Sequence, residues 1–172
     1  AIEQKKPLHL LGLVSDGGVH AHIQHLIALI NGAHEAGVPE IYIHAFTDGR
    51  DTDPKSGKGF LQTLESNIVG KARVASVSGR YYAMDRDQRW DRVEKAWDCL
   101  VKGRAVFNNE DAGTALEEAY ARDESDEFVS PTTIGSYDGI KDGDVVIFVT
   151  FRADRAREIS QAFVQPDFEG FE

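Results

Sequence analysis

An α/β fold with a mostly parallel sheet and helices on both faces, a three-layer sandwich, is predicted for this chain of 172 residues. Short apolar runs alternate along the chain with segments whose apolar residues recur every three to four positions. Short connections join them, and several of the apolar runs end in polar loops. This alternation is typical of β–α–β units, whose strands lie parallel.

Each element follows from its hydrophobic period. Ile23, Leu26 and Ile30 recur at helical spacing, and Gly37 followed by Pro39 is a typical helix end. Continuous apolar runs indicate strands that are buried on both faces. By these criteria we expect strands at 9–14, 41–46, 74–77 and 145–149, and helices at 20–36, 59–69, 88–102, 112–121 and 153–163.

Two segments are less regular. Residues 128–134 contain Pro131 and fit either a strand or a loop. Residues 122–127 are rich in acidic side chains, and we expect them to form a solvated loop. No internal repeat interrupts the pattern, so we predict a single domain over residues 1–172.

The bulk composition excludes several classes of protein. A net charge of −10 and a pI near 5.0 argue against a nucleic-acid partner, which requires a basic surface. No apolar stretch approaches the roughly 20 residues of a membrane span, and the start lacks a signal peptide. The single cysteine, Cys99, fits a cytoplasmic location and is expected to fill the core. Because the chain starts at Ala1 without an initiator Met, we expect it to be part of a longer protein.

Polar loops follow four of the predicted strands. They are S-D-G-G-V-H-A-H (15–22), T-D-G-R-D-T-D-P (47–54), S-G-R-Y-Y-A-M-D-R-D-Q-R-W-D-R (78–92) and F-R-A-D-R-A-R (151–157). If the strands are parallel, all four loops lie at the edge where open α/β sheets bind ligands. The side chains expected to converge there are His20, Arg50, Asp51, Arg80, Arg86, Arg152 and Arg155.

Arginine is well suited to an anion site. Its planar guanidinium can donate two parallel hydrogen bonds to phosphate or carboxylate, and it stays charged at any working pH. The recurrence of arginine after successive strands therefore predicts a site for a small, multiply charged anion. We interpret Arg89, Arg92 and Arg104 differently, as surface residues paired along a helix with Asp91 and Glu94.

Sharper motifs are absent. The chain has no complete P-loop, dinucleotide fingerprint, EF-hand loop or G-x-S-x-G sequence. His20, His22 and His25 are too few for a metal ligand set, and we predict no metal in this chain. We expect one of these histidines to cap the following helix and another to contact the ligand.

The four loops, taken together and in order, resemble the cofactor-independent (2,3-bisphosphoglycerate-independent) phosphoglycerate mutases. The stretches that carry this resemblance are S-D-G-G-V-H-A-H, H-A-F-T-D-G-R-D-T-D-P, S-G-R-Y-Y-A-M-D-R-D and F-R-A-D-R-A-R-E-I, which cover most of the chain. Two positions depart from the family pattern: Thr150 replaces an expected Asn and Ala21 an expected Ser. Both changes leave the charged residues intact.

The resemblance implies an isomerase of glycolysis and gluconeogenesis with two domains. An alkaline-phosphatase-like domain would carry two manganese ions and a serine nucleophile, and an inserted phosphotransferase domain would hold the substrate. This chain matches most of the second domain, and the metal domain is absent from it. The reaction interconverts 3-phosphoglycerate and 2-phosphoglycerate through a phosphoserine. We expect this chain to be a monomer, to bind no metal, nucleic acid or membrane, and to be inactive alone.

The resemblance also implies roles for individual residues. Arg152 and Arg155 would bind the phosphate, while His20, Arg50, Asp51, Arg80 and Arg86 would hold the glycerate and its carboxylate. Asp51 would position the glycerate hydroxyl or accept its proton, and Asp48, Asp53 and Pro54 would shape the turn. His20, with an unperturbed pKa of about 6.5, is the competing base.

Two other functions remain open at this point. One is a non-catalytic module that binds phosphorylated metabolites. The other is a metal-dependent hydrolase, which would bind divalent ions tightly to this chain alone.

Overall fold

Six strands form one twisted sheet in the computed structural model, which describes residues 1–171. In chain order they are β1 (Leu8–Leu13), β2 (Ile41–Thr47), β3 (Arg73–Gly79), β4 (Phe107–Asn109), β5 (Thr132–Ile134) and β6 (Val145–Phe148). Their order across the sheet is β4-β5-β3-β2-β1-β6. β1, β2, β3 and β6 run parallel, whereas β5 pairs antiparallel with β3 and parallel with β4. The prediction of a mostly parallel sheet is confirmed.

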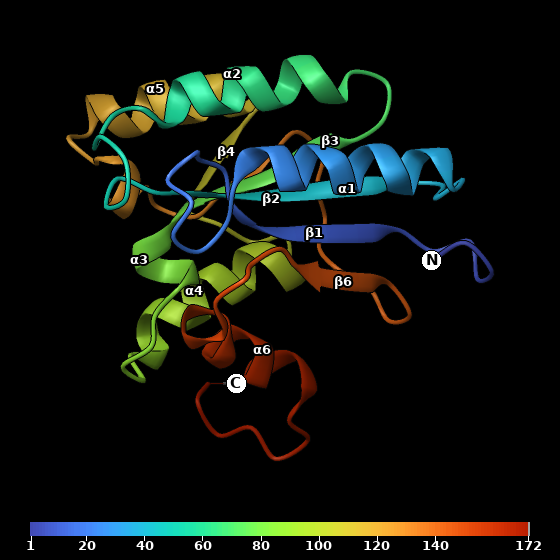
Figure 1. Cartoon of the computed structure of the whole chain (residues 1–172). Coiled ribbons are helices and arrows are strands. Elements are labelled where there is room, and N and C mark those ends of the chain that lie inside the picture. The colour runs from blue at the N-terminus through green and yellow to red at the C-terminus, as the bar shows by residue number, and fades with distance from the viewer. Residues whose placement is uncertain (172) are drawn as a thin grey trace.

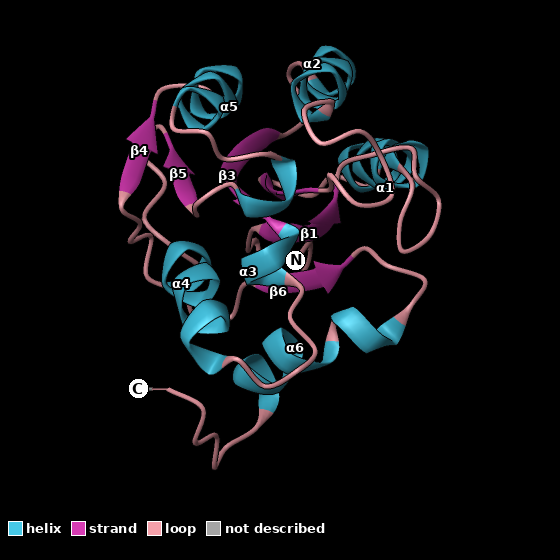
Figure 2. Ribbon diagram, turned by 90° about the vertical axis from the view of Figure 1, so that its left-hand side faces the viewer, coloured by secondary structure: helices cyan, strands magenta, loops and turns pink. Residues whose placement is uncertain are grey.

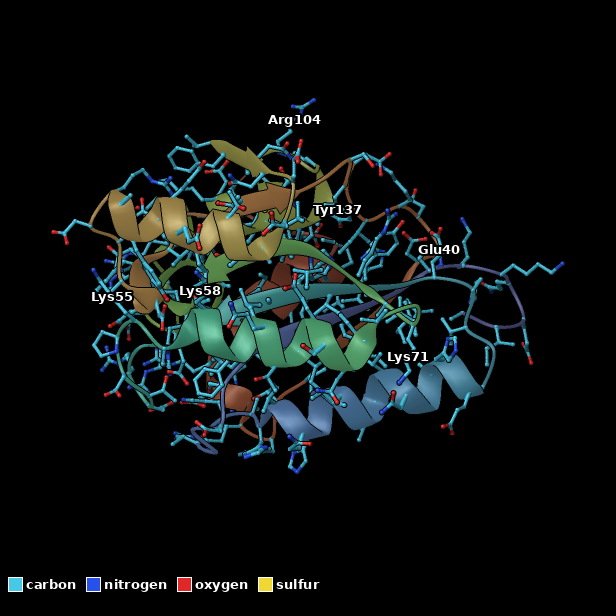
Figure 3. All side chains as sticks on the ribbon, turned by 90° about the horizontal axis from the view of Figure 1, so that it is seen from above. Glu40, Lys55, Lys58, Lys71, Arg104 and Tyr137 are labelled. Atoms are coloured by element: carbon cyan, nitrogen blue, oxygen red, sulfur yellow. The ribbon has the colours of Figure 1, made fainter. Side chains whose placement is uncertain are left out.

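Helices cover both faces of this sheet, as predicted. The longer helices are α1 (Ile23–Glu35), α2 (Gly57–Ile68), α4 (Trp90–Val101), α5 (Ala112–Ala121) and α6 (Arg157–Val164), and α3 (Arg80–Ala83) is a single turn. Figures 1 and 2 show α1, α2 and α5 on one face and α3, α4 and α6 on the other. Seen from above, α1, α2 and α5 lie side by side over the strands (Figure 3). The molecule is a three-layer α/β sandwich.

The core lies in two layers, one on each face of the sheet. Leu10 and Leu11 are adjacent in β1 and both fully buried, yet they belong to opposite layers. Successive side chains of a strand point to opposite faces, so a strand covered on both sides is apolar along most of its length. This explains the continuous apolar run in the sequence. Cys99 is also buried, as expected for a residue that fills the core.

The predicted strands and long helices are all present, with ends that differ by a few residues. Residues 128–134, ambiguous in sequence, contribute the end of a 3-10 turn (Asp126–Phe128) and the strand β5. Two short elements, α3 and β4, were not predicted from the sequence. Both are too short for a hydrophobic period to develop, and each is held by contacts with distant segments.

One prediction about the loops was wrong. Residues 122–127 were expected to be a solvated acidic loop, but Asp126 has no solvent exposure. It accepts hydrogen bonds from the backbone N–H of Gly57, at 2.7 Å, and from the hydroxyl of Tyr120. The segment is therefore only partly solvated, and its buried Asp126 ties the start of α2 to the end of α5.

Candidate anion-binding site

The four polar loops lie at one edge of the sheet, because the strands that precede them are parallel. In Figure 1 this edge is the one beside α3. A cleft of about 430 Å³ opens there. Its lining consists of Arg50, Arg80, Tyr81, Met84, Asp85, Arg86, Asp87, Arg89, Arg92, Glu127, Phe128 and Arg155. Arginine is the most frequent residue in this lining, which gives the cleft the positive charge predicted for an anion site.

The loop after β2 is organised by one buried carboxylate, Asp48. Its Oδ1 accepts from the backbone N–H groups of Arg50, at 3.2 Å, and Asp51, at 3.0 Å, while the hydroxyl of Ser15 donates to Oδ2 at 2.7 Å. Burial opposes the charge of Asp48, but these donors and Arg80 hold its pKa below the usual range. Asp48 shapes the turn, as predicted.

Gly49 is the residue that allows this turn to approach its neighbour. Its φ is +68°, a backbone conformation that residues other than glycine rarely adopt. A Cβ at this position would lie 2.8 Å from the backbone nitrogen of Glu127. The close approach brings Glu127 beside Arg50, whose Nη1 lies 3.1 Å from the Glu127 carboxylate.

Arg80 occupies the floor of the cleft. Its side chain is only 4% exposed, and Nη1 lies 2.7 Å from both Asp48 Oδ1 and Asp51 Oδ2. These two carboxylates keep the pKa of Arg80 above its ordinary value despite burial. Arg80 therefore links the loop after β2 to the loop after β3 and fixes the carboxylate of Asp51.

Arg50, Arg86 and Arg155 form the more open walls. The side chains of Arg50 and Arg86 are 56% and 49% exposed, so both are accessible to a ligand. Burial and the nearby charges of Arg86, Arg80 and Arg50 lower the pKa of Arg155 from its ordinary value. The guanidinium groups of the cleft are thus close enough to repel one another, and a bound anion would offset this repulsion.

His20 and Arg152 lie beside the cleft rather than in its lining, and Asp154 connects them to it. Asp154 Oδ2 is 3.1 Å from Arg86 Nη1 and 3.3 Å from Arg152 Nη2. Its Oδ1 is 3.9 Å from Nδ1 of the buried His20. The structure thus brings all seven predicted site residues to one edge: four line the cleft, Asp51 is held at its floor, and two stand at its side.

Sequence reasoning missed part of the lining. Arg89 and Arg92 are accessible at the surface, as interpreted, with side chains 44% and 25% exposed, but their ion-pair partner is Asp85, at 3.1 and 3.7 Å, rather than Asp91 or Glu94. Asp85 is buried and accepts from the backbone N–H groups of Asp87 and Arg89. A signal was present, since five charged residues occur within 85–89 and 92, but only the turn between α3 and α4 places them around one cleft.

The remaining histidines have local roles. His22 caps α1, because its Nδ1 accepts from the backbone N–H of Gln24 at 3.2 Å. This confirms the prediction that one histidine caps the helix. Thr150, at a position where Asn was expected, donates its hydroxyl to the backbone carbonyl of His20 at 2.9 Å and so ties the first loop to the last.

Within residues 1–171, no group of three or more His, Cys, Asp or Glu side chains is arranged to hold a metal ion. In the same part of the chain, no helix is long and apolar enough to cross a membrane.

Known proteins resemble this chain over nearly its whole length. The family model described as BPG-independent PGAM N-terminus (iPGM_N) matches residues 1–172. The 2,3-bisphosphoglycerate-independent phosphoglycerate mutase of Pseudomonas fluorescens is 52% identical over 174 residues, which include 100% of this chain and 34% of that protein. The enzyme of the same name from Enterobacter sp. is 54% identical over 177 residues, covering 99% of this chain and 34% of that protein.

A solved structure shows the same architecture. A crystal structure of Leishmania mexicana phosphoglycerate mutase at low cobalt concentration superposes with a TM-score of 0.91 and 35% identity, over 96% of this chain and 33% of that one. The chain spans about a third of the length of the relatives it matches. The fold, the order of the loops and the family match together show that this chain belongs to the BPG-independent phosphoglycerate mutase N-terminal family.

Proposed function

We propose that this chain is the substrate-holding part of a cofactor-independent phosphoglycerate mutase, an isomerase of glycolysis and gluconeogenesis that interconverts 3-phosphoglycerate and 2-phosphoglycerate. The observation that carries the proposal is the crowding of Arg50, Arg80, Arg86 and Arg155 around one cleft. Family membership supplies the reaction. Both substrates are small and carry a phosphate and a carboxylate, which matches a cleft with several guanidinium groups.

In this proposal, different arginines bind the two anionic ends of the substrate. Arg152 and Arg155 follow β6 and bind the phosphate, whereas Arg50 and Arg86 bind the carboxylate of the glycerate. Hydrogen bonds to charged groups contribute about 1.5–3 kcal/mol each, so a few bidentate contacts are enough to retain glycerate between two phosphoryl transfers. Retention matters because the glycerate must reorient without leaving.

Asp51 is the proposed positioning group for the glycerate hydroxyl. Its carboxylate is 20% exposed and already accepts from buried Arg80, which fixes its direction. His20 is the alternative base. Burial, followed by the positive charges of Arg80 and Arg152, lowers the pKa of His20 from 6.5, so its imidazole is neutral at pH 7 and able to accept a proton.

The serine nucleophile and two manganese ions of the proposed reaction are assigned to the part of the longer protein that lies outside this chain. The described residues do not fit manganese, since they include no suitable group of three ligands. We therefore propose that the chain alone is inactive. Cytoplasmic location and a monomeric state belong to the same proposal.

A mutase assay on the longer parent protein, with this chain beside it, tests the proposal. We expect conversion of 3-phosphoglycerate by the parent in the presence of Mn²⁺ and none by the chain. Calorimetry with 3-phosphoglycerate should detect binding to the chain and a large loss of affinity in Arg155→Met. Mutase activity in the chain alone, or an inactive parent with Mn²⁺ bound, contradicts it.

The second candidate is a non-catalytic module for phosphorylated metabolites. It is favoured by the same cleft, which concentrates cationic groups. The parent assay separates the two: a module binds 3-phosphoglycerate but leaves it unchanged in every form of the protein.

A further inference from the structure

Asp154 is not among the residues assigned to the substrate, yet it is the point at which three of them meet. One oxygen, Oδ2, faces two guanidinium groups, those of Arg86 at 3.1 Å and Arg152 at 3.3 Å. The other oxygen, Oδ1, faces Nδ1 of His20 at 3.9 Å. Among the described residues, Asp154 is the one carboxylate within ion-pair distance of both Arg86 and His20.

The contact between Asp154 and His20 is incomplete. A separation of 3.9 Å is too long for a hydrogen bond. Both Asp154 Oδ1 and His20 Nδ1 are buried atoms with no hydrogen-bond partner among the described residues. Buried polar atoms without partners are costly, by about 1–3 kcal/mol for each group, so a small movement that joins these two atoms is favourable.

The other oxygen of this carboxylate, Oδ2, is engaged with arginine. Arg86 and Arg152 are each about half exposed, at 49% and 48%, and both lie where an anion would compete with Asp154 for their donors. A phosphate or carboxylate that binds these guanidinium groups releases Oδ2. The carboxylate can then rotate toward His20, whose backbone is already fixed by Thr150 and Phe151.

We propose that Asp154 is the positioning residue for His20: an anion takes Arg86 and Arg152 from Oδ2, and Oδ1 then accepts the Nδ1–H of the imidazole. That hydrogen bond selects the tautomer in which Nε2 is the unprotonated nitrogen and can accept a proton. Asp154 thereby couples occupation of the cleft to the orientation of the base. The inference rests on the proposed function and adds a residue to it.

Four charged groups act on His20 from the elements around it. Arg80 on α3 and Arg152 before the turn Ala153–Arg155 disfavour the protonated ring, whereas Asp154 and Asp51 favour it. Replacement of Asp154 by Asn removes one of the two favourable charges. The same change keeps the size of the side chain, and the 30% exposure of Asp154 makes a folding defect a small risk.

The first experiment observes His20 directly by ¹⁵N NMR of the histidine rings in the whole chain. The signals that are lost in His20→Gln identify those of His20. Without ligand, Asp154→Asn should lower the pKa of His20 by about half a pH unit or more. With saturating inorganic phosphate, the wild type should shift toward the Nδ1–H tautomer, and Asp154→Asn should not. Asp138→Asn, which removes the same charge from an 83% exposed position, is the matched control and should behave as wild type.

The second experiment measures mutase kinetics in the longer parent. We expect Asp154→Asn to lower kcat about tenfold with little increase in KM, and Asp154→Glu to restore part of the loss. An unchanged tautomer response and unchanged kcat in Asp154→Asn overturn the inference. An inactive wild-type parent instead overturns the proposed function, and the NMR comparison with phosphate still decides the role of Asp154.

Discussion

Arg80 Nη1 lies 2.7 Å from Asp51 Oδ2, and the guanidinium group that makes this contact is only 4% exposed. The same nitrogen lies 2.7 Å from Asp48 Oδ1. One buried cation thus holds two carboxylates from the neighbouring loop. In the proposed enzyme, Arg80 has a supporting role in addition to any contact with the substrate. It fixes the carboxylate of Asp51, which would contact the glycerate hydroxyl.

The first prediction concerns this ion-pair group. Arg80→Met leaves Asp48 and Asp51 without their shared cation, and unpaired buried charge costs about 3–5 kcal/mol. We expect the free energy of unfolding in urea to fall by that amount. Arg104→Met is the control: Figure 3 shows Arg104 extending away from the ribbon, and its loss should change stability by less than about 0.5 kcal/mol.

The second prediction concerns pH. The pKa of Asp48 is below its usual range in the folded chain, so its carboxylate stabilises the fold above the unfolded pKa of about 3.9. This stabilisation disappears as the pH falls from that value through the folded pKa. The difference in unfolding free energy between wild type and Asp48→Asn should be greatest near pH 7 and shrink below about pH 4. A difference that is constant from pH 7 to pH 3 would contradict the assignment.

The third prediction concerns buried Asp126, which lies in a segment expected from the sequence to be a solvated loop. Tyr120 donates to the fully buried Asp126, and Tyr120→Phe leaves that oxygen without this donor. We expect a loss of about 1–3 kcal/mol in unfolding free energy. Tyr42→Phe, which removes a hydroxyl that donates to Glu40 at the surface, should cost less than about 1 kcal/mol.

The fourth prediction addresses substrate binding. Arg50→Lys in the longer parent keeps the positive charge but loses the planar pair of donors, so kcat/KM should fall at least tenfold, about 1.4 kcal/mol. Arg104→Lys makes the same chemical change at a residue outside the lining of the cleft and should leave activity unaltered. Near-normal turnover by Arg50→Lys would remove Arg50 from the site.

The fifth prediction concerns Cys99. Burial raises the pKa of its thiol to about 12, and the side chain is 1% exposed. Because the thiolate is the reactive form, Cys99 should not react with a disulfide reagent in the folded chain at pH 8 and should react fully in urea. Rapid labelling of the folded chain would show that the core opens at α4.

Much of the site was predictable because its determinants are local. A continuous apolar run with a polar loop behind it identifies a parallel strand and the place where a ligand binds, so Arg50, Arg86 and Arg155 could be placed at one edge from sequence alone. The contributions of Arg89, Arg92 and Asp154 could not. Their sequence neighbours resemble the charged face of an exposed helix, and their direction depends on the turn after α3 and on the docking of α6.

The sequence by itself determined the fold class, the family and the edge of the sheet that carries the arginines. The hydrophobic pattern of a strand and the polar residues of the loop after it are both local features of the sequence. Only the tertiary structure decided which charges are partners. Arg80 and Asp48 are separated by 32 residues, and Arg86 and Asp154 by 68, yet each pair is in contact. Such pairs arise because parallel strands bring distant loops together, and the distances between their side chains depend on packing that no local pattern contains.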